Sequence, residues 1–231
     1  VEEIKFLDDN FFVSKPRVKS LLKILAEEFK DMVFSVPSGT EVNALDAEVI
    51  ELMAKANFYR VTLAVEAGDE EVQAARISKN VKVSRVEEIT GLIKANGMQT
   101  HALFMIGFPD ETRAQIMKTV ELAKTLVVDD FYFSVVTPLP GTPLYDECVR
   151  RDLLYDDFDV NNIRYSVANI KLPDMSREEL EGIRRSVWLE KKSQMAESPQ
   201  EEDGNLFRQF EDSGEYEYAG WQKLPSEFKE D

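Results

Sequence analysis

Short runs of apolar residues alternate along this chain with longer stretches in which apolar residues recur at helical spacing. The runs predict five strands, at residues 3–8, 32–36, 60–65, 100–107 and 130–136. Their first residues lie 28 to 40 positions apart, which is the length of a strand, a helix and two loops. Each step is therefore expected to be a βα unit, and the strands are expected to run parallel.

The segments between the strands carry helix signals. The predicted helices begin near Ser14, Asp46, Glu70, Ser84, Asp110 and Ser176. In two of them a serine is followed three residues later by glutamate, Ser84 by Glu87 and Ser176 by Glu179, which is the pattern of a capping box. Gly97 is expected to end the fourth helix, the fifth is predicted over 110–126, and the last runs towards Gln194.

This order of elements predicts an α/β fold. A closed eight-stranded barrel takes about 250 residues, whereas this chain has 231 residues and shows five strands. A partial barrel or an open doubly wound sheet remains. We expect a core over 1–150 and a helical extension over 151–195.

Residues 196–231 differ from the rest in composition. They contain eleven acidic and three basic residues, so loose packing is expected for an acidic tail with too little apolar surface to offset its ordering entropy. Its aromatic residues argue against a purely solvating role; they are Phe207, Phe210, Tyr216, Tyr218, Trp221 and Phe228. We expect the tail to be dispensable for folding.

Charge and composition narrow the class of protein. The net charge is −16, which disfavours nucleic acid and anionic lipid as partners. One cysteine, Cys148, excludes an internal disulfide framework. No apolar run approaches the length of a membrane span, so a cytoplasmic protein is expected. The chain begins at Val1, almost directly in a strand, which suggests that an upstream segment has been removed.

Polar or conformationally special residues follow each predicted strand. They are found at 8–10, 37–40, 66–68, 107–111 and 137–142. Because parallel strands end at the same edge of a sheet, these residues are expected to meet at one polar mouth. Asn10 and Asp110 are equally well explained as turn or capping residues. Glu66 follows a buried strand and is favoured as a ligand-facing carboxylate, since a charge there needs a partner.

Several segments resemble the radical SAM superfamily, and most closely its cobalamin-associated iron–sulfur branch. The resemblance covers residues 1 to about 190. It rests on IKFLDDNF at 4–11, VTLAVEAG at 61–68, ISK at 77–79, FMIGFPDET at 104–112 and PLPGTPLY at 138–145.

The resemblance implies a partial (β/α)6 barrel in which strands two to six are present. Such a barrel binds S-adenosylmethionine, and a four-iron four-sulfur cluster cleaves it to a deoxyadenosyl radical. Cobalamin on an upstream domain is a further implied cofactor. The implied cofactor-binding residues are Asp8, Asp9 and Asn10 near the methionine amino group, Lys79 near its carboxylate, Glu66 near the ribose, Gly107 and Phe108 near the adenine, and Ser38 and Pro138 at neighbouring strand ends.

The sequence also departs from the family pattern. The three-cysteine cluster motif and the strand before it are absent, and Leu103 stands where a glycine is common. Cys148 is interpreted as a half-buried structural thiol and His101 as a structural residue at the far end of its strand. The chain as given is therefore expected to be inactive.

Three functions remain open from the sequence. The first is the core of a radical SAM enzyme, an oxidoreductase or cobalamin-dependent methyltransferase with a small-molecule substrate and an electron donor such as flavodoxin or ferredoxin. The second is a barrel without a cluster that serves as a binding or scaffold module. The third, an unrelated α/β enzyme for a phosphate compound, is disfavoured because no glycine-rich phosphate loop is present.

Overall fold

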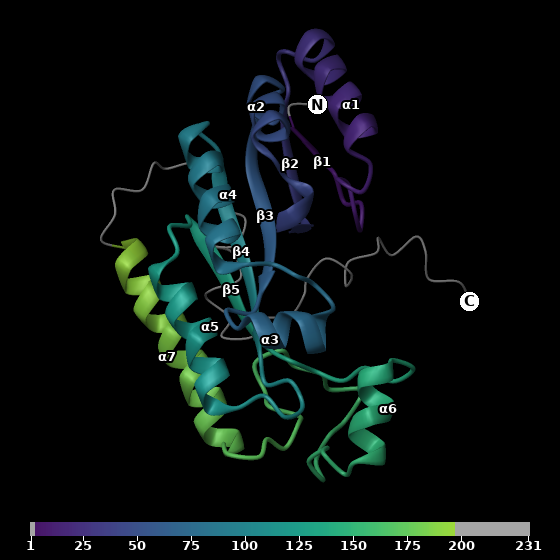
Figure 1. Ribbon diagram of the computed structural model, residues 1–231, viewed down its shortest axis with the longest axis vertical. Coiled ribbons are helices and arrows are strands. Elements are labelled where there is room, and N and C mark those ends of the chain that lie inside the picture. Colours follow the sequence, from purple (N-terminus) through teal and green to yellow (C-terminus); the bar gives the residue numbers. More distant parts are fainter. Residues whose placement is uncertain (1–2, 197–231) are drawn as a thin grey trace, which may run out of the picture. The chain divides into compact units, whose positions relative to one another are not determined.

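Five parallel strands form one sheet in the computed structural model, which describes residues 3–196 (Figure 1). The strands are β1 (Glu3–Lys5), β2 (Val33–Glu41), β3 (Phe58–Glu66), β4 (Gln99–Ile106) and β5 (Asp130–Val135). Their order in the sheet is the order along the chain, and every neighbouring pair is parallel. The five predicted strands are thus confirmed, with shifted ends.

Helices occupy the connections between strands. The α-helices are α1 (Lys15–Glu28), α2 (Ala47–Lys55), α3 (Glu70–Val72), α4 (Val83–Ala95), α5 (Arg113–Thr125), α6 (Pro143–Arg150) and α7 (Arg177–Ala196). A 3₁₀-helix, η1 (Val42–Ala44), follows β2, and a π-helix, η2 (Gln73–Ile77), continues α3. Helices α4 and α5 both contact β4, and α7 lies beside α5 (Figure 1), where Glu190 of α7 contacts Lys124 of α5 at 2.6 Å.

The strand order decides between the two architectures that the sequence left open. An open doubly wound sheet reverses its order at a switch point, whereas a barrel adds each new strand on the same side of the previous one. This sheet has no reversal. The partial barrel is therefore confirmed.

The core lies between the sheet and its helices. Alternate residues of β3, Val61, Leu63 and Val65, are fully buried and pack with Phe104 and Ile106 of β4. Thr62 and Ala64 between them are also buried, so both faces of β3 are covered, as is usual in a parallel sheet. The packing holds the carboxyl ends of the strands in register towards the α3 and α6 end of the sheet (Figure 1).

Two predicted helix starts are wrong. Helix α4 begins at Val83 behind Lys82, and no side chain caps it, so Ser84 and Glu87 form no capping box. Helix α5 begins at Arg113 instead of near 110, and Thr112 with Gln115 forms its capping box. The physical reason lies in Asp110, whose φ of 63° is incompatible with a helix. At α7 the Ser176 hydroxyl accepts the Glu179 amide at 3.2 Å, so the predicted N-terminus is confirmed.

The outer edge of β5 is closed by other parts of the chain. The amide of Phe131 donates to the Asp130 carboxylate at 2.8 Å, and the Val135 amide donates to the Tyr165 carbonyl at 2.7 Å. Between them, Nε of Arg184 in α7 donates to the Phe133 carbonyl at 2.8 Å. Exposed strand edges otherwise invite further pairing.

Within the described range, residues 3–195 form one compact unit. Apart from Ala196, the predicted acidic tail lies outside the described residues. None of the helices within 3–196 combines the length and apolar character that crossing a bilayer requires.

Candidate functional site

Glu66 ends β3 in a conformation that side-chain-bearing residues rarely adopt. Its φ is 68°, and the register between β3 and β4 shifts between Ala64 and Glu66. The amide of Ala67 donates to the Val65 carbonyl at 3.0 Å, so Glu66 is the central residue of a three-residue turn. The Glu66 side chain is only 14% exposed. The turn directs its carboxylate towards Nζ of Lys79, which lies 3.0 Å away. The partner expected for Glu66 is thus present.

A bulge in β2 brings its backbone close to the neighbouring strands. Val36 pairs with Val61 and Thr40 with Leu63, so residues 37–39 of β2 lie opposite the single residue Thr62 of β3. They were predicted to follow the strand, but they lie inside it. A Cβ on Gly39 would lie 3.1 to 3.2 Å from side-chain atoms of Leu103 and Ala64.

The bulge also leaves polar atoms at this end of the sheet. Thr40 has a buried Oγ1 without a hydrogen-bond partner within the described part of the chain. Ser38 is half-buried beside it. Backbone at a bulge and an unpaired hydroxyl are features of a surface that another molecule approaches closely.

The loop after β4 is built around a buried carboxylate. Gly107 has φ 91°, and its amide donates to Oε2 of Glu111 at 2.6 Å, while the Phe108 amide donates to the same oxygen at 3.0 Å. Glu111 is 2% exposed, and its Oε1 has no hydrogen-bond partner among residues 3–196. Burial raises the pKa of Glu111 to about 7, although the two amides oppose this shift. The Gly107 and Phe108 amides are consequently engaged within the loop.

An apolar cluster lies beneath these strand ends. Phe108, Ala67, Val136 and Cys148 belong to it, so the loops after β3, β4 and β5 share one packed base with α6. Pro138 is also buried. The Phe108 side chain packs in this cluster. Phe108 therefore contributes to the strand-end site by fixing the position of the loop backbone.

Four charged residues form an ion-pair network at the same end of the sheet. Arg76 of η2 contacts Asp110 at 2.8 Å and Glu147 of α6 at 3.0 Å. Arg151 contacts Asp110 and Glu147, both at 2.6 Å. The hydrogen bond from Arg151 holds the pKa of Asp110 below its usual value. Burial alone would raise the pKa of Glu147, but the two arginines outweigh burial and lower it.

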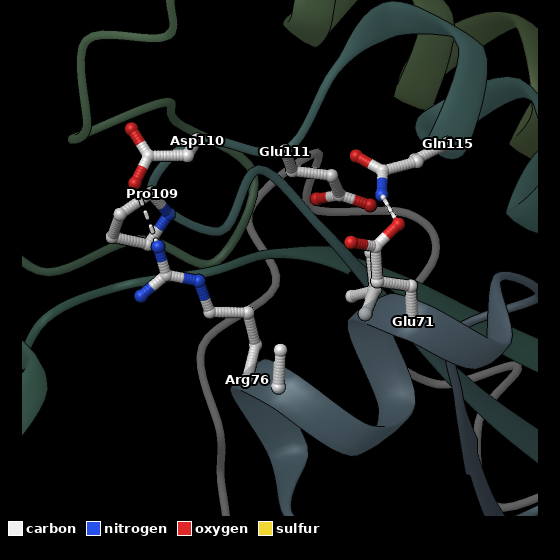
Figure 2. Close-up of a pocket in the computed structure, with 8 residues that line it drawn as sticks. Glu71, Arg76, Pro109, Asp110, Glu111 and Gln115 are labelled. Atoms are coloured by element: carbon white, nitrogen blue, oxygen red, sulfur yellow. Dashed lines mark hydrogen bonds and ion pairs between the residues drawn. The ribbon is translucent and has the colours of Figure 1, made fainter.

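A small pocket lies between η2 and the loop after β4 (Figure 2). Its volume is about 170 Å³, and it is lined by Glu71, Val72, Ala75, Arg76, Pro109, Asp110, Glu111 and Gln115. In Figure 2 the Arg76–Asp110 contact borders one side, and Gln115 donates to Glu71 on the other at 3.4 Å. The nearby Asp69 caps α3 and contacts Lys118 at 2.7 Å.

The structure brings some of the predicted residues together and leaves others apart. Glu66 and Lys79 form an ion pair, and Gly107 and Phe108 share the Glu111 carboxylate. The residues after β1 lie in an exposed turn, in which Asp8 and Asp9 form no ion pair with any residue of the described range. Asn10 contributes its carbonyl to that turn by accepting the Val13 amide at 3.3 Å.

Sequence reasoning missed Glu111 and the arginine network. Glu111 follows Gly107 by four residues, and a glycine with a nearby acid was the available signal for a carboxylate that binds loop amides. Arg76 and Arg151 are 75 positions apart. No local pattern indicated that they share Asp110 and Glu147.

Neither the lone cysteine nor the histidine offers a metal centre. Cys148 is fully buried, and burial raises the pKa of its thiol to about 11. His101 is buried at the start of β4 with Nε2 4.0 Å from Asp130, and burial lowers its pKa. Within residues 3–196 no three His, Cys, Asp or Glu side chains are grouped so that they could hold a metal ion.

Comparison with known proteins provides a family context for this site. The sequence profile of the radical SAM superfamily matches residues 1–123, more than half of the chain. An uncharacterised methyltransferase of Pyrococcus horikoshii is 27% identical over 191 residues, which cover 82% of this chain and 40% of that protein. Cytidylyl-2-hydroxyethylphosphonate methyltransferase of Streptomyces wedmorensis is 24% identical over 181 residues, 76% of this chain and 34% of its own. The chain thus spans 34% to 40% of the length of these relatives.

Solved structures share the fold. The radical S-adenosylmethionine methyltransferase TsrM from Kitasatospora setae, with cobalamin and a four-iron four-sulfur cluster bound, superposes with a TM-score of 0.58 at 19% identity. The match covers 64% of this chain and 30% of TsrM. Coproporphyrinogen III oxidase from Escherichia coli gives a TM-score of 0.57 at 16% identity, covering 84% of this chain and 41% of the oxidase.

Proposed function

The chain belongs to the radical SAM superfamily, and on that premise we propose that the carboxyl end of its sheet binds S-adenosylmethionine. The observation that carries the proposal is the Glu66–Lys79 pair, a poorly exposed carboxylate held beside an ammonium at a strand end. A carboxylate accepts hydrogen bonds from the two hydroxyls of a ribose, and an ammonium with three donors can hold Glu66 and a ligand carboxylate together.

The neighbouring residues fit a nucleoside. Gly39 lies against Ala64 and Leu103, where a Cβ would meet their side chains at 3.1 to 3.2 Å, so the glycine lets the β2 bulge pack closely beside β3 and β4. The unpaired Thr40 hydroxyl lies in the same bulge. The Gly107–Phe108 backbone, held by Glu111, is proposed to face the adenine, with Ser38 and Pro138 at its sides. Asp8, Asp9 and Asn10 are proposed to face the amino group of the methionine.

The residues of this chain do not fit the four-iron four-sulfur cluster. Such clusters are held by several cysteine thiolates, whereas the single cysteine here is fully buried with a raised pKa. A complete enzyme therefore needs cluster ligands that this sequence does not contain. The part proposed for this chain is to bind and orient the cofactor, which supplies radical or methyl-transfer chemistry when bound.

The methyltransferases among the relatives favour methyl transfer to a small molecule for the complete enzyme. Cobalamin is proposed as a second cofactor because TsrM, which shares the fold, binds it. An electron donor such as flavodoxin or ferredoxin and a cytoplasmic location belong to the same proposal. A second candidate function is a cluster-free binding module, which is consistent with Cys148 being fully buried as a structural thiol.

Glu66→Gln tests the proposal. Calorimetric titration of the full chain with S-adenosylmethionine and with adenosine should show affinity weakened by about 1–3 kcal/mol, the contribution of a charge-assisted hydrogen bond. Glu70→Gln, an exposed residue of α3, removes the same charge nearby and should leave affinity unchanged. Unchanged affinity in Glu66→Gln together with a large loss of melting temperature would make Glu66 structural. A wild-type chain that binds neither compound would refute the proposal.

An experiment on the complete protein distinguishes the radical SAM enzyme from the cluster-free binding module. Under reducing, anaerobic conditions a radical SAM enzyme should consume S-adenosylmethionine, and the binding module should bind it without consuming it.

A further inference from the structure

Gln73 begins the π-helix η2 and turns its side chain back under the end of β3. It is 2% exposed, and its Nε2 donates to the Val65 carbonyl at 2.6 Å and to the Ala67 carbonyl at 2.7 Å. Both partners are acceptors, so the amide orientation is fixed. The two carbonyls flank Glu66, so one side-chain amide clamps the turn that Glu66 occupies.

The backbone of Gln73 holds the other member of the ion pair. Its carbonyl accepts the Lys79 amide at 3.0 Å, and Ser78 between them adopts a left-handed conformation with φ 59°. Residues 73–77 form the π-helix, whose wider turn adds a residue relative to an α-helix. Gln73 therefore bonds the residues on both sides of Glu66 through its side chain and Lys79 through its backbone.

The turn needs such a clamp. A non-glycine residue at φ 68° is strained and persists only where surrounding contacts over-determine it. The Val65 carbonyl already accepts the Ala67 amide at 3.0 Å, and the Gln73 amide adds a second bond to it. The Glu66 carboxylate thereby stays directed to Lys79.

Gln73 is a costly residue for a buried position. Its Oε1 is buried and has no hydrogen-bond partner within residues 3–196. Burying an unpaired polar atom reduces stability, and an apolar residue of similar size would avoid that cost. Residues that lower stability while they hold a strained turn are typical of functional sites, so we interpret Gln73 as a functional residue.

We propose that Gln73 is a positioning residue that sets the Glu66–Lys79 pair for cofactor binding. The inference rests on the proposed function, because Gln73 acts through Glu66. It predicts that the contribution of Gln73 to affinity disappears when the Glu66 carboxylate is absent.

A double-mutant cycle on the full chain tests this coupling. Gln73→Met keeps the side-chain length and removes both donors, and calorimetric titration with S-adenosylmethionine should show affinity weakened about tenfold, the loss expected for hydrogen bonds that hold a charged group. In the Glu66→Gln background the same substitution should weaken affinity by less than about twofold. Gln99→Met replaces an exposed amide at the amino end of β4, far from the strand ends that carry Glu66, so it serves as the matched control and should leave affinity within about twofold of the wild type.

The outcomes distinguish the inference from the function beneath it. If Glu66→Gln itself leaves affinity unchanged, the proposed function fails and Gln73 has nothing to act through. If Glu66→Gln weakens binding but Gln73→Met does not, or if the two effects add fully, only the role of Gln73 is refuted.

Gln73→Glu provides a second variant if Gln73→Met unfolds. When protonated at pH 5.5, the carboxyl group introduced by this substitution has one hydrogen-bond donor in place of two. The affinity of this variant for S-adenosylmethionine should therefore lie between that of the wild type at the same pH and that of the Glu66→Gln chain. Wild-type affinity in a folded Gln73→Glu chain would overturn the inference.

Discussion

The amide of Gly68 lies 2.9 Å from Oγ1 of Thr119, so the chain leaving β3 is in direct contact with the middle of α5. Thr119 is fully buried, and Lys118 beside it contacts Asp69 at 2.7 Å. This contact fixes the loop that carries Glu66 against the helix that follows the Gly107 loop.

Gly68→Ala should therefore lower the free energy of unfolding by about 1–3 kcal/mol, the usual cost of an overpacked position. A Cβ there would lie 2.5 Å from the Lys118 carbonyl oxygen and 2.8 Å from Cα of Thr119, and backbone atoms cannot move aside cheaply. Gly91→Ala is the control, since nothing lies within 4 Å of its Cβ on α4, and it should stabilise by about 1 kcal/mol. Denaturant titration compares the two, and equal effects would contradict the close packing.

Glu111 should make stability depend on pH. Its pKa rises from 4.5 to about 7 on folding, so between these values the native protein binds more protons than the unfolded chain. Stability should therefore fall as pH rises through this window, by about 3 kcal/mol in total at 1.4 kcal/mol per unit.

Glu111→Gln isolates this effect, because its amide oxygen can still accept the Gly107 and Phe108 amides without a charge. Thermal melts at pH 5 and pH 8 should show a smaller decrease in the variant than in the wild type. Parallel pH profiles would show that Glu111 does not titrate in this range.

Removing Arg76 should loosen the attachment of α6. Arg76→Met leaves Glu147 and Asp110 with Arg151 as their remaining cation, and about 1–2 kcal/mol of stability should be lost, with the loss shrinking at high salt. Arg150→Met is the control, since Arg150 is exposed on the same helix. A loss that persists unchanged in 1 M salt would point to packing of the arginine stem as its cause.

The Cys148 thiol should react only slowly with disulfide reagents in the folded chain. Its thiol is fully buried and its pKa is raised to about 11, so little thiolate exists at pH 8. A disulfide reagent such as Ellman's should react slowly in buffer and completely in denaturant. Rapid reaction of the native chain would mean that the α6 segment opens readily.

Anaerobic reconstitution of the full chain with iron and sulfide should leave no stoichiometric cluster. One buried thiol cannot replace the set of cysteines that such a cluster needs. Iron and sulfide assays after desalting measure this. A competent cluster at one per chain would overturn the assignment of its ligands to residues outside this sequence.

The sequence predicted the parallel strands and most helices because hydrophobic periodicity and caps are local signals. It predicted Glu66 and Lys79 as neighbours of one ligand, but not that they contact each other. The missing information was the left-handed turn at Glu66, which is fixed by Gln73 and by packing of Gly68 on α5. Such conformations depend on contacts between segments that are distant in the sequence. A pattern of local propensities carries no information about those contacts.

The same limit explains the misplaced boundaries. Residues 37–39 have the composition of a turn, with proline, serine and glycine, yet β3 holds them inside β2 as a bulge. Asp110 resembles a helix cap in sequence, but Arg76 and Arg151 take its carboxylate and Glu111 occupies the loop amides.

The bonded edge of β5 makes the two edges of this sheet unequal as places where a further strand could pair. Side-chain and loop groups already bond to one outward backbone atom each of Phe131, Phe133 and Val135, while among the described residues β1 pairs only with β2. We therefore expect an additional strand to join on the β1 side. Arg184→Leu would free one β5 carbonyl and permit head-to-tail association of sheets, β5 of one molecule against β1 of the next, which is the geometry of an open-ended fibre.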